Sequence, residues 1–135
     1  MSYKVLVIED EPDVATYLAT LLRTNGYEPE IVTDPNEAFA MIEKVKPDLI
    51  SLDIMMPEKS GLSMYTELRQ QPAFQDIPVV IVSGVTEESQ FDFHALVADD
   101  SIPEPDGYFE KPVDVDRYLA AIRSLLNRSR QAERK

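Results

Sequence analysis

Short apolar runs alternate with amphipathic segments along the whole chain. The apolar runs are rich in β-branched residues and predict five strands, over residues 3–8, 27–33, 48–53, 77–83 and 106–112. Between and after them, apolar residues recur at helical spacing, which predicts five helices beginning near Pro12, Asp34, Ser60, Glu87 and Asp114. Strands that alternate with helices are typical of a parallel sheet covered on both faces. The pattern therefore predicts an α/β fold.

Several predicted boundaries carry the residues expected at such positions. Pro12 fits the first turn of a helix, and Asn25-Gly26 is a signal for the end of that helix. Asp34-Pro35 forms an N-cap and first-turn pair for the second helix. Pro29 removes a backbone donor, which favours the edge of the sheet for the second strand. The helix over 87–98 has the weakest pattern of the five.

Composition narrows the class of protein. The 135 residues suffice for one domain with a real core, and 44% of them are hydrophobic. The net charge of −12 disfavours nucleic-acid binding, because phosphate contacts need clustered Lys and Arg. The absence of cysteine excludes disulfides, thiolate metal sites and a Cys nucleophile.

No apolar run is long enough to be the core of a signal peptide or a membrane span. We therefore expect a cytoplasmic protein with no membrane contact.

Polar residues gather where the predicted strands end. Glu9 and Asp10 follow the first strand, Asp53 ends the third, Ser83 ends the fourth and Lys111 lies at the end of the fifth. Ligands of a doubly wound sheet bind at this carboxyl edge. An all-oxygen group of carboxylates suits Mg²⁺, while a lysine and a hydroxyl nearby can hold phosphoryl oxygens. The pattern indicates phosphoryl-transfer chemistry.

Four segments in order carry a resemblance to a known family: "VLVIEDEP", "DLISLDIMMPEKSGL", "VVIVSG" and "GYFEKP". Over about residues 3–127 the chain resembles the receiver domains of two-component response regulators. The resemblance implies a flavodoxin-like (βα)5 fold with strand order 2-1-3-4-5. It leaves 1–127 as the receiver domain and 128–135 as a basic tail or the start of a linker.

The resemblance also implies a role for each matching residue. Asp53 would be the nucleophile that takes a phosphoryl group, in the presence of Mg²⁺, from the phosphohistidine of a sensor histidine kinase or a histidine phosphotransferase. Asp10 and Asp53 would bind the metal directly, with the Met55 carbonyl as third ligand and Glu9 acting through a bound water. Ser83 and Lys111 would hold the phosphoryl oxygens, with Gly84 as the small neighbour of Ser83. Tyr108 would be the aromatic switch that passes the change to a downstream output domain or protein. Such a protein is a signalling phosphoacceptor and not a conventional enzyme.

The chain departs from the family pattern in three places. Glu9 stands where the family more often has Asp. Met55 and Val85 lie where receivers tune water access, and both are apolar, which predicts slow self-dephosphorylation. Residues 97–107 replace a short turn and carry four acids and two prolines. We expect a solvated loop there, at the end of the fifth strand away from the acids.

Other functions remain open from the residues alone. A receiver-like scaffold that works without phosphorylation is one alternative, although the set Asp10, Asp53, Ser83 and Lys111 is complete. A haloacid dehalogenase-type phosphohydrolase would need a second Asp where Met55 stands. A flavodoxin-like electron carrier needs a phosphate-cradling loop, whereas "EDEPDV" is acidic. The single histidine, His94, is expected at the surface or in packing.

Overall fold

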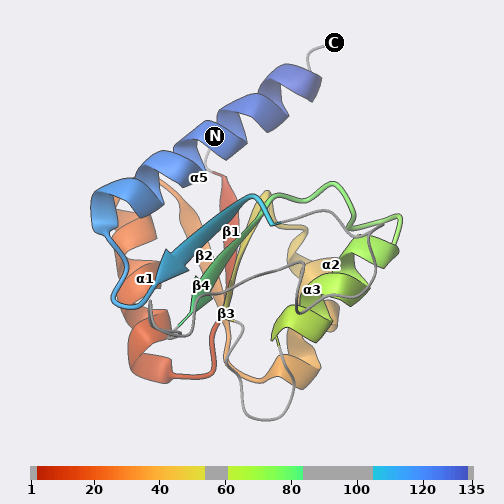
Figure 1. The fold of residues 1–135 in the computed structure, drawn as a ribbon, viewed down its shortest axis with the longest axis horizontal. Helices are drawn as coiled ribbons and strands as arrows, with labels where there is room; N and C mark the ends of the chain where they lie inside the picture. Colours follow the sequence, from red (N-terminus) through yellow and green to blue (C-terminus); the bar gives the residue numbers. More distant parts are fainter. Residues whose placement is uncertain (1–2, 54–60, 84–104, 134–135) are drawn as a thin grey trace.

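The computed structural model describes residues 3–53, 61–83 and 105–133. It contains one parallel five-stranded sheet in the order β2-β1-β3-β4-β5 (Figure 1). This confirms the predicted α/β class and the predicted strand order. The strands are β1 (Lys4–Ile8), β2 (Glu28–Val32), β3 (Leu49–Asp53), β4 (Val79–Ser83) and β5 (Gly107–Glu110).

The helices lie on both faces of the sheet, as predicted. They are α1 (Pro12–Thr24), α2 (Ala38–Val45), α3 (Gly61–Gln70) and α5 (Val115–Glu133), with a 3-10 turn over Pro35–Glu37 before α2. Figure 1 shows α1 and α5 on one face and α2 and α3 on the other. The predicted helix over 87–98 lies outside the described residues.

Successive side chains of the central strands point to opposite faces of the sheet and pack in two separate hydrophobic cores. Leu6, Ile50 and Ile81 point toward α2 and α3, where Met64, Tyr65 and Leu68 are fully buried. Their sequence neighbours point the other way and meet α1 and α5, where Leu22, Tyr118 and Ile122 are buried. Because both faces are covered, all five residues of β3 are buried, Asp53 among them. Met64 fills the first of these cores, as expected for a methionine in a gap.

Local signals explain where several elements begin and end. Asp34 caps the 3-10 turn by accepting a hydrogen bond from the Asn36 N–H at 2.9 Å. Asn25 is the C-cap of α1, and Gly26 follows with a φ of +92°, a conformation that glycine adopts without strain. Lys46 ends α2 in the same left-handed region, with a φ of 52°.

Two boundaries differ from the prediction. β5 covers only Gly107–Glu110 and is therefore shorter than the predicted run over 106–112. α5 continues to Glu133, into the segment 128–135 that was predicted as a tail or the start of a linker, so its backbone is helical across the predicted domain boundary at residue 127. That domain boundary itself stays a prediction.

One edge of the sheet is formed by β2, which pairs with β1 alone. Its sequence EPEIV places Glu28, Pro29 and Glu30 along this edge, and both glutamates are exposed. The predicted edge position of the second strand is thus confirmed. Within the described part of the chain, no helix is long and apolar enough to cross a membrane.

Candidate functional site

The parallel register brings the predicted acids together at the carboxyl edge of the sheet. Ile8 on β1 pairs with Leu52 on β3, so the next residues, Glu9 and Asp53, follow side by side. Glu9 and Asp53 are each only 1% exposed, and Asp10 is partly buried. Burying an ionised carboxylate is unfavourable unless a cation compensates its charge, so this edge of the sheet needs nearby positive charge.

The three carboxylates form a possible cation site. Glu9, Asp10 and Asp53 each offer an oxygen, and the three oxygens lie within 4.8 Å of one another. Asp10 Oδ1 is buried and accepts no hydrogen bond from the described residues. An orphaned oxygen beside two other carboxylates fits an oxygen-binding divalent cation such as Mg²⁺. Among the residues described, these are the ones that could hold the metal.

Lys111 supplies a fixed cation to the same cluster. It follows β5 directly, and its Nζ lies 2.9 Å from Glu9 Oε1, 3.4 Å from Asp53 Oδ2 and 3.5 Å from Glu11 Oε1. The contact to Glu9 is an ion pair without good hydrogen-bond alignment. The lysine side chain thus brings its positive charge next to Asp53 and Glu9. The Lys111-Pro112 peptide bond is cis.

Burial and mutual repulsion shift the pKa values of the cluster. Burial and the neighbouring Asp53 together raise the pKa of Glu9 to about 7, against the opposing effect of Lys111. Burial and the neighbouring Asp53 also raise the pKa of Asp10. Burial lowers the pKa of Lys111, but the carboxylates of Glu9, Asp53 and Glu11 outweigh it, so the pKa lies above its usual value. One ammonium thus balances the cluster incompletely, which leaves room for a second cation.

The remaining predicted residues fall into two groups. Ser83 ends β4, the strand next to β3, and pairs with Glu110 on β5. Tyr108 lies on β5, one strand farther from β3, and pairs with Ile81. Tyr108 is 41% exposed, an outward position for an aromatic residue. Outside the described residues lie Met55, Gly84, Val85 and His94. Their predicted roles, and the slow dephosphorylation expected from two of them, stay predictions.

Sequence reasoning missed two features of this site. The shortest contact of Lys111 is with Glu9, whereas the prediction centred on Asp53. Glu11, 62% exposed in its side chain, also faces Lys111, and its N–H donates to Glu9 Oε2 at 3.2 Å. Three consecutive acids, Glu9, Asp10 and Glu11, stand in the sequence, and this run could have indicated that Glu11 also lies at the site.

A groove of about 400 Å³ opens beside the cluster. It is lined by residues of α1 and of the segment after β5, among them Glu11, Tyr17, Lys111 and Pro112. The groove thus reaches Lys111 from the α1 side. Together, a buried carboxylate, a possible cation site and a lysine form a centre that can receive a phosphoryl group in line.

Comparison with known proteins agrees with this geometry. The sequence matches the family model of the response regulator receiver domain over residues 5–123. It is 32% identical to protein Rrf1 of Nitratidesulfovibrio vulgaris, over 90% of this chain and 81% of that protein. It is 33% identical to response regulator MprA of Mycobacterium bovis, over 96% of this chain and 53% of that protein. The chain thus spans about half the length of the latter relative.

Solved structures share the fold. The receiver domain of Francisella response regulator 1452 has a TM-score of 0.78 and 29% identity, covering 95% of this chain and 99% of that one. A receiver domain protein from Methanospirillum hungatei has a TM-score of 0.80 at 22% identity, covering 98% and 99%, respectively. The second likeness bears on the fold alone.

Proposed function

Because the chain belongs to the response regulator receiver family, we propose that it accepts a phosphoryl group on Asp53 from the phosphohistidine of a sensor histidine kinase or histidine phosphotransferase. The observation that carries the proposal is the position of Asp53. It is buried at the end of β3, with Lys111 at 3.4 Å and with carboxylate oxygens of Glu9 and Asp10 within 4.8 Å. Receiver domains act in two-component signalling, and this chain is a signalling domain of that kind.

In the proposed reaction an Asp53 oxygen forms a bond to phosphorus while the bond from phosphorus to the imidazole nitrogen breaks. The imidazole nitrogen keeps the electron pair and takes a proton from solvent. The Lys111 ammonium, whose raised pKa keeps it charged, pairs with a phosphoryl oxygen. Ser83 would donate its hydroxyl to another. Mg²⁺, when bound by Asp10 and Asp53, with the Met55 carbonyl and a water on Glu9, would neutralise charge on the transferred group.

Phosphorylation would change the balance of charge around Lys111, which now faces three carboxylates. We propose that Ser83 and Tyr108 pass this change to the surface, where an output domain or a separate protein responds. Tyr108 is 41% exposed, an outward position from which the proposed switch would turn it inward. With a phosphohistidine donor the protein would act in the cytoplasm, without contacting nucleic acid or membrane itself.

Intact mass measured after incubation with Mg²⁺ and acetyl phosphate tests the proposal. We expect one added phosphoryl group, absent without Mg²⁺ and absent in Asp53→Asn. A matched control is Asp48→Asn, an exposed acid at the opposite end of β3, which should be phosphorylated like the wild type. If neither acetyl phosphate nor a phosphorylated histidine kinase modifies the wild type, and Mg²⁺ does not bind, the chain is a phosphorylation-independent scaffold.

A further inference from the structure

The register of β5 is weakly specified by its own side chains. The strand has four residues, it lies at a sheet edge, and its residues alternate between half-buried and exposed, with none fully buried. β3, by contrast, is buried at every position. Burial fixes strand register only where one face is clearly inside, so β5 needs another source of register.

Asp106, the residue before β5, supplies two hydrogen bonds that fix where the strand begins. Its N–H donates to the Val79 carbonyl at 2.8 Å, and its Oδ2 accepts the Val79 N–H at 2.9 Å. One residue thus binds both backbone groups of Val79, at the start of β4. Sliding β5 by one residue would break both hydrogen bonds.

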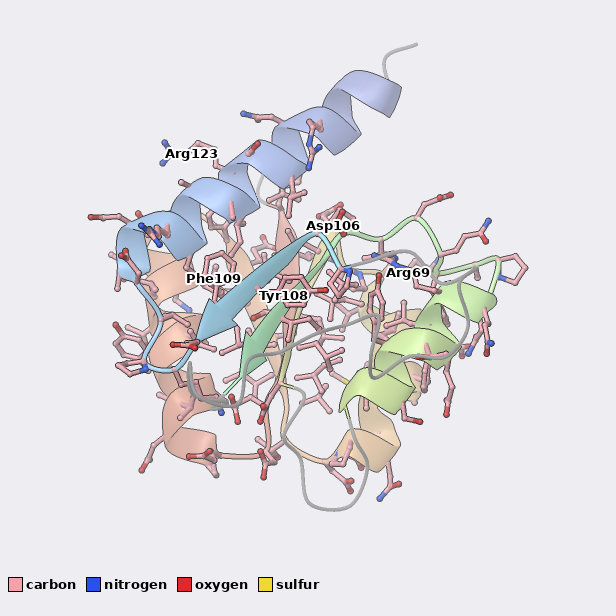
Figure 2. The ribbon with its side chains drawn as sticks, viewed as in Figure 1. Arg69, Asp106, Tyr108, Phe109 and Arg123 are labelled. Atoms are coloured by element: carbon pink, nitrogen blue, oxygen red, sulfur yellow. The ribbon has the colours of Figure 1, made fainter. Side chains whose placement is uncertain are left out.

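Arg69 holds the Asp106 carboxylate in place. Its Nη2 lies 3.2 Å from Asp106 Oδ2, and its Nη1 donates to the Gln75 and Ile77 carbonyls at 2.9 and 2.7 Å. Its Nε donates to the Tyr65 hydroxyl at 3.0 Å. The Arg69 side chain is only 6% exposed, so α3 and the turn after it fix the guanidinium. Figure 2 shows Arg69 and Asp106 close together at the start of β5, with Tyr108 and Phe109 farther along the strand.

The other end of β5 leads directly to a residue of the proposed reaction site. Lys111 follows β5 directly and reaches Asp53 and Glu9. A slip of one residue would move Lys111 by about 3.3 Å and exchange the faces of Tyr108 and Phe109. Phe109 packs edge-on against buried Tyr118 at 5.5 Å between ring centroids, and that contact would be lost.

We propose that Asp106 and Arg69 are positioning residues for the reaction at Asp53, because they set the register of β5 and thereby the place of Lys111. This inference rests on the proposed phosphoacceptor function. Neither residue lies near the reacting atoms, since both are at the opposite end of the sheet from Asp53. They act through the backbone of β5.

The test distinguishes an effect on the position of Lys111 from an effect on metal binding. The described carboxylates of the cation site come from β3 and the end of β1, not from β5. In Asp106→Ala we expect phosphorylation by acetyl phosphate at saturating Mg²⁺ to slow by about 10-fold, as expected for a misplaced group, with Mg²⁺ affinity within about twofold of wild type. Asp106→Asn keeps an acceptor for the Val79 N–H but loses the charge, and should slow the reaction by only about 3-fold. Asp76→Ala, which removes an exposed acid near the same turn, is the matched control and should change neither quantity.

Two results would overturn the inference: an unchanged rate in Asp106→Ala, or rate and Mg²⁺ affinity falling together in a variant still folded by circular dichroism. Hydrogen exchange decides the point independently of phosphorylation. Exchange in Asp106→Ala should accelerate at residues 107–110 while the amides of β3 remain protected, and unchanged exchange in β5 would also overturn it. If the wild type takes no phosphoryl group at all, the proposed function fails, and the exchange result still decides whether Asp106 sets the register.

Discussion

The two ends of the sheet differ in how completely their charged groups are compensated. At the amino end one cation, Arg69, meets one anion, Asp106, and the guanidinium also donates to Tyr65, Gln75 and Ile77. At the carboxyl end the carboxylates of Glu9, Asp10 and Asp53 lie together, and Lys111 pairs with Glu9 and Asp53. One oxygen of Asp10 accepts no hydrogen bond from the described residues. A balanced cluster stabilises the fold by itself, whereas an unbalanced one binds a cation or responds to a change of charge.

The largest effect that the comparison predicts is at the carboxyl end. Asp10→Asn should weaken Mg²⁺ binding by about 100-fold, because it removes a charged ligand from the cation site. The same variant should raise the free energy of unfolding of the metal-free protein by about 1 kcal/mol, because it relieves carboxylate repulsion. Calorimetric Mg²⁺ titration and urea unfolding measure the two. A loss of stability without metal would show that the cluster is already balanced.

Removing the cation at the amino end of the sheet should only lower the stability of the protein. Arg69→Met leaves Asp106 and two carbonyls without their donor, and we expect the free energy of unfolding in urea to fall by about 2 kcal/mol. Arg117→Met is the control, because Arg117 is 84% exposed and lies 3.9 Å from Asp114. Its change should stay within about 0.5 kcal/mol. Equal losses in the two variants would contradict the contrast between the ends.

The third predicted effect is a dependence of the stability on pH. The pKa of Glu9 is raised from 4.5 to about 7 in the folded protein, so its ionisation opposes folding. Without divalent cations, this contribution to stability is fully present below pH 4.5, decreases as the pH rises and is lost above about 7. We expect a loss of about 2 kcal/mol between pH 5 and 8 for this group.

Urea unfolding of the wild type and Glu9→Gln at several pH values checks this. The variant should lack most of that decline, since glutamine does not titrate. Saturating Mg²⁺ should oppose the decline in the wild type, because the metal binds ionised carboxylates better as the pH rises. A wild-type stability that rises across this window without metal would refute the assignment.

The sequence predicted the fold because its central elements are specified locally. The apolar runs that became β1, β3 and β4 are buried on both faces, and such runs have few alternatives to a covered parallel sheet. Asp53 and Lys111 were predictable as a pair because strand ends in a parallel sheet share one edge.

What escaped prediction depends on long-range or weakly patterned features. Arg69 and Asp106 are 37 positions apart, and the sequence around each residue does not indicate that the two are in contact. The end of α5 is polar, so no apolar periodicity indicated that the helix continues to Glu133. The choice of Glu9 as the nearest partner of Lys111 depends on side-chain packing, which a strand-end argument does not resolve.

The edge formed by β2 has a consequence for behaviour at high concentration. A sheet edge with unpaired backbone groups is a template for a strand of another molecule, and repeated pairing leads to aggregates. Here an incoming strand would meet two exposed glutamates, and Pro29 offers no N–H for it to bind. A second copy would bring the same two acids opposite them. The β2 edge of the sheet therefore disfavours the addition of further strands, and with it the growth of fibres from this side.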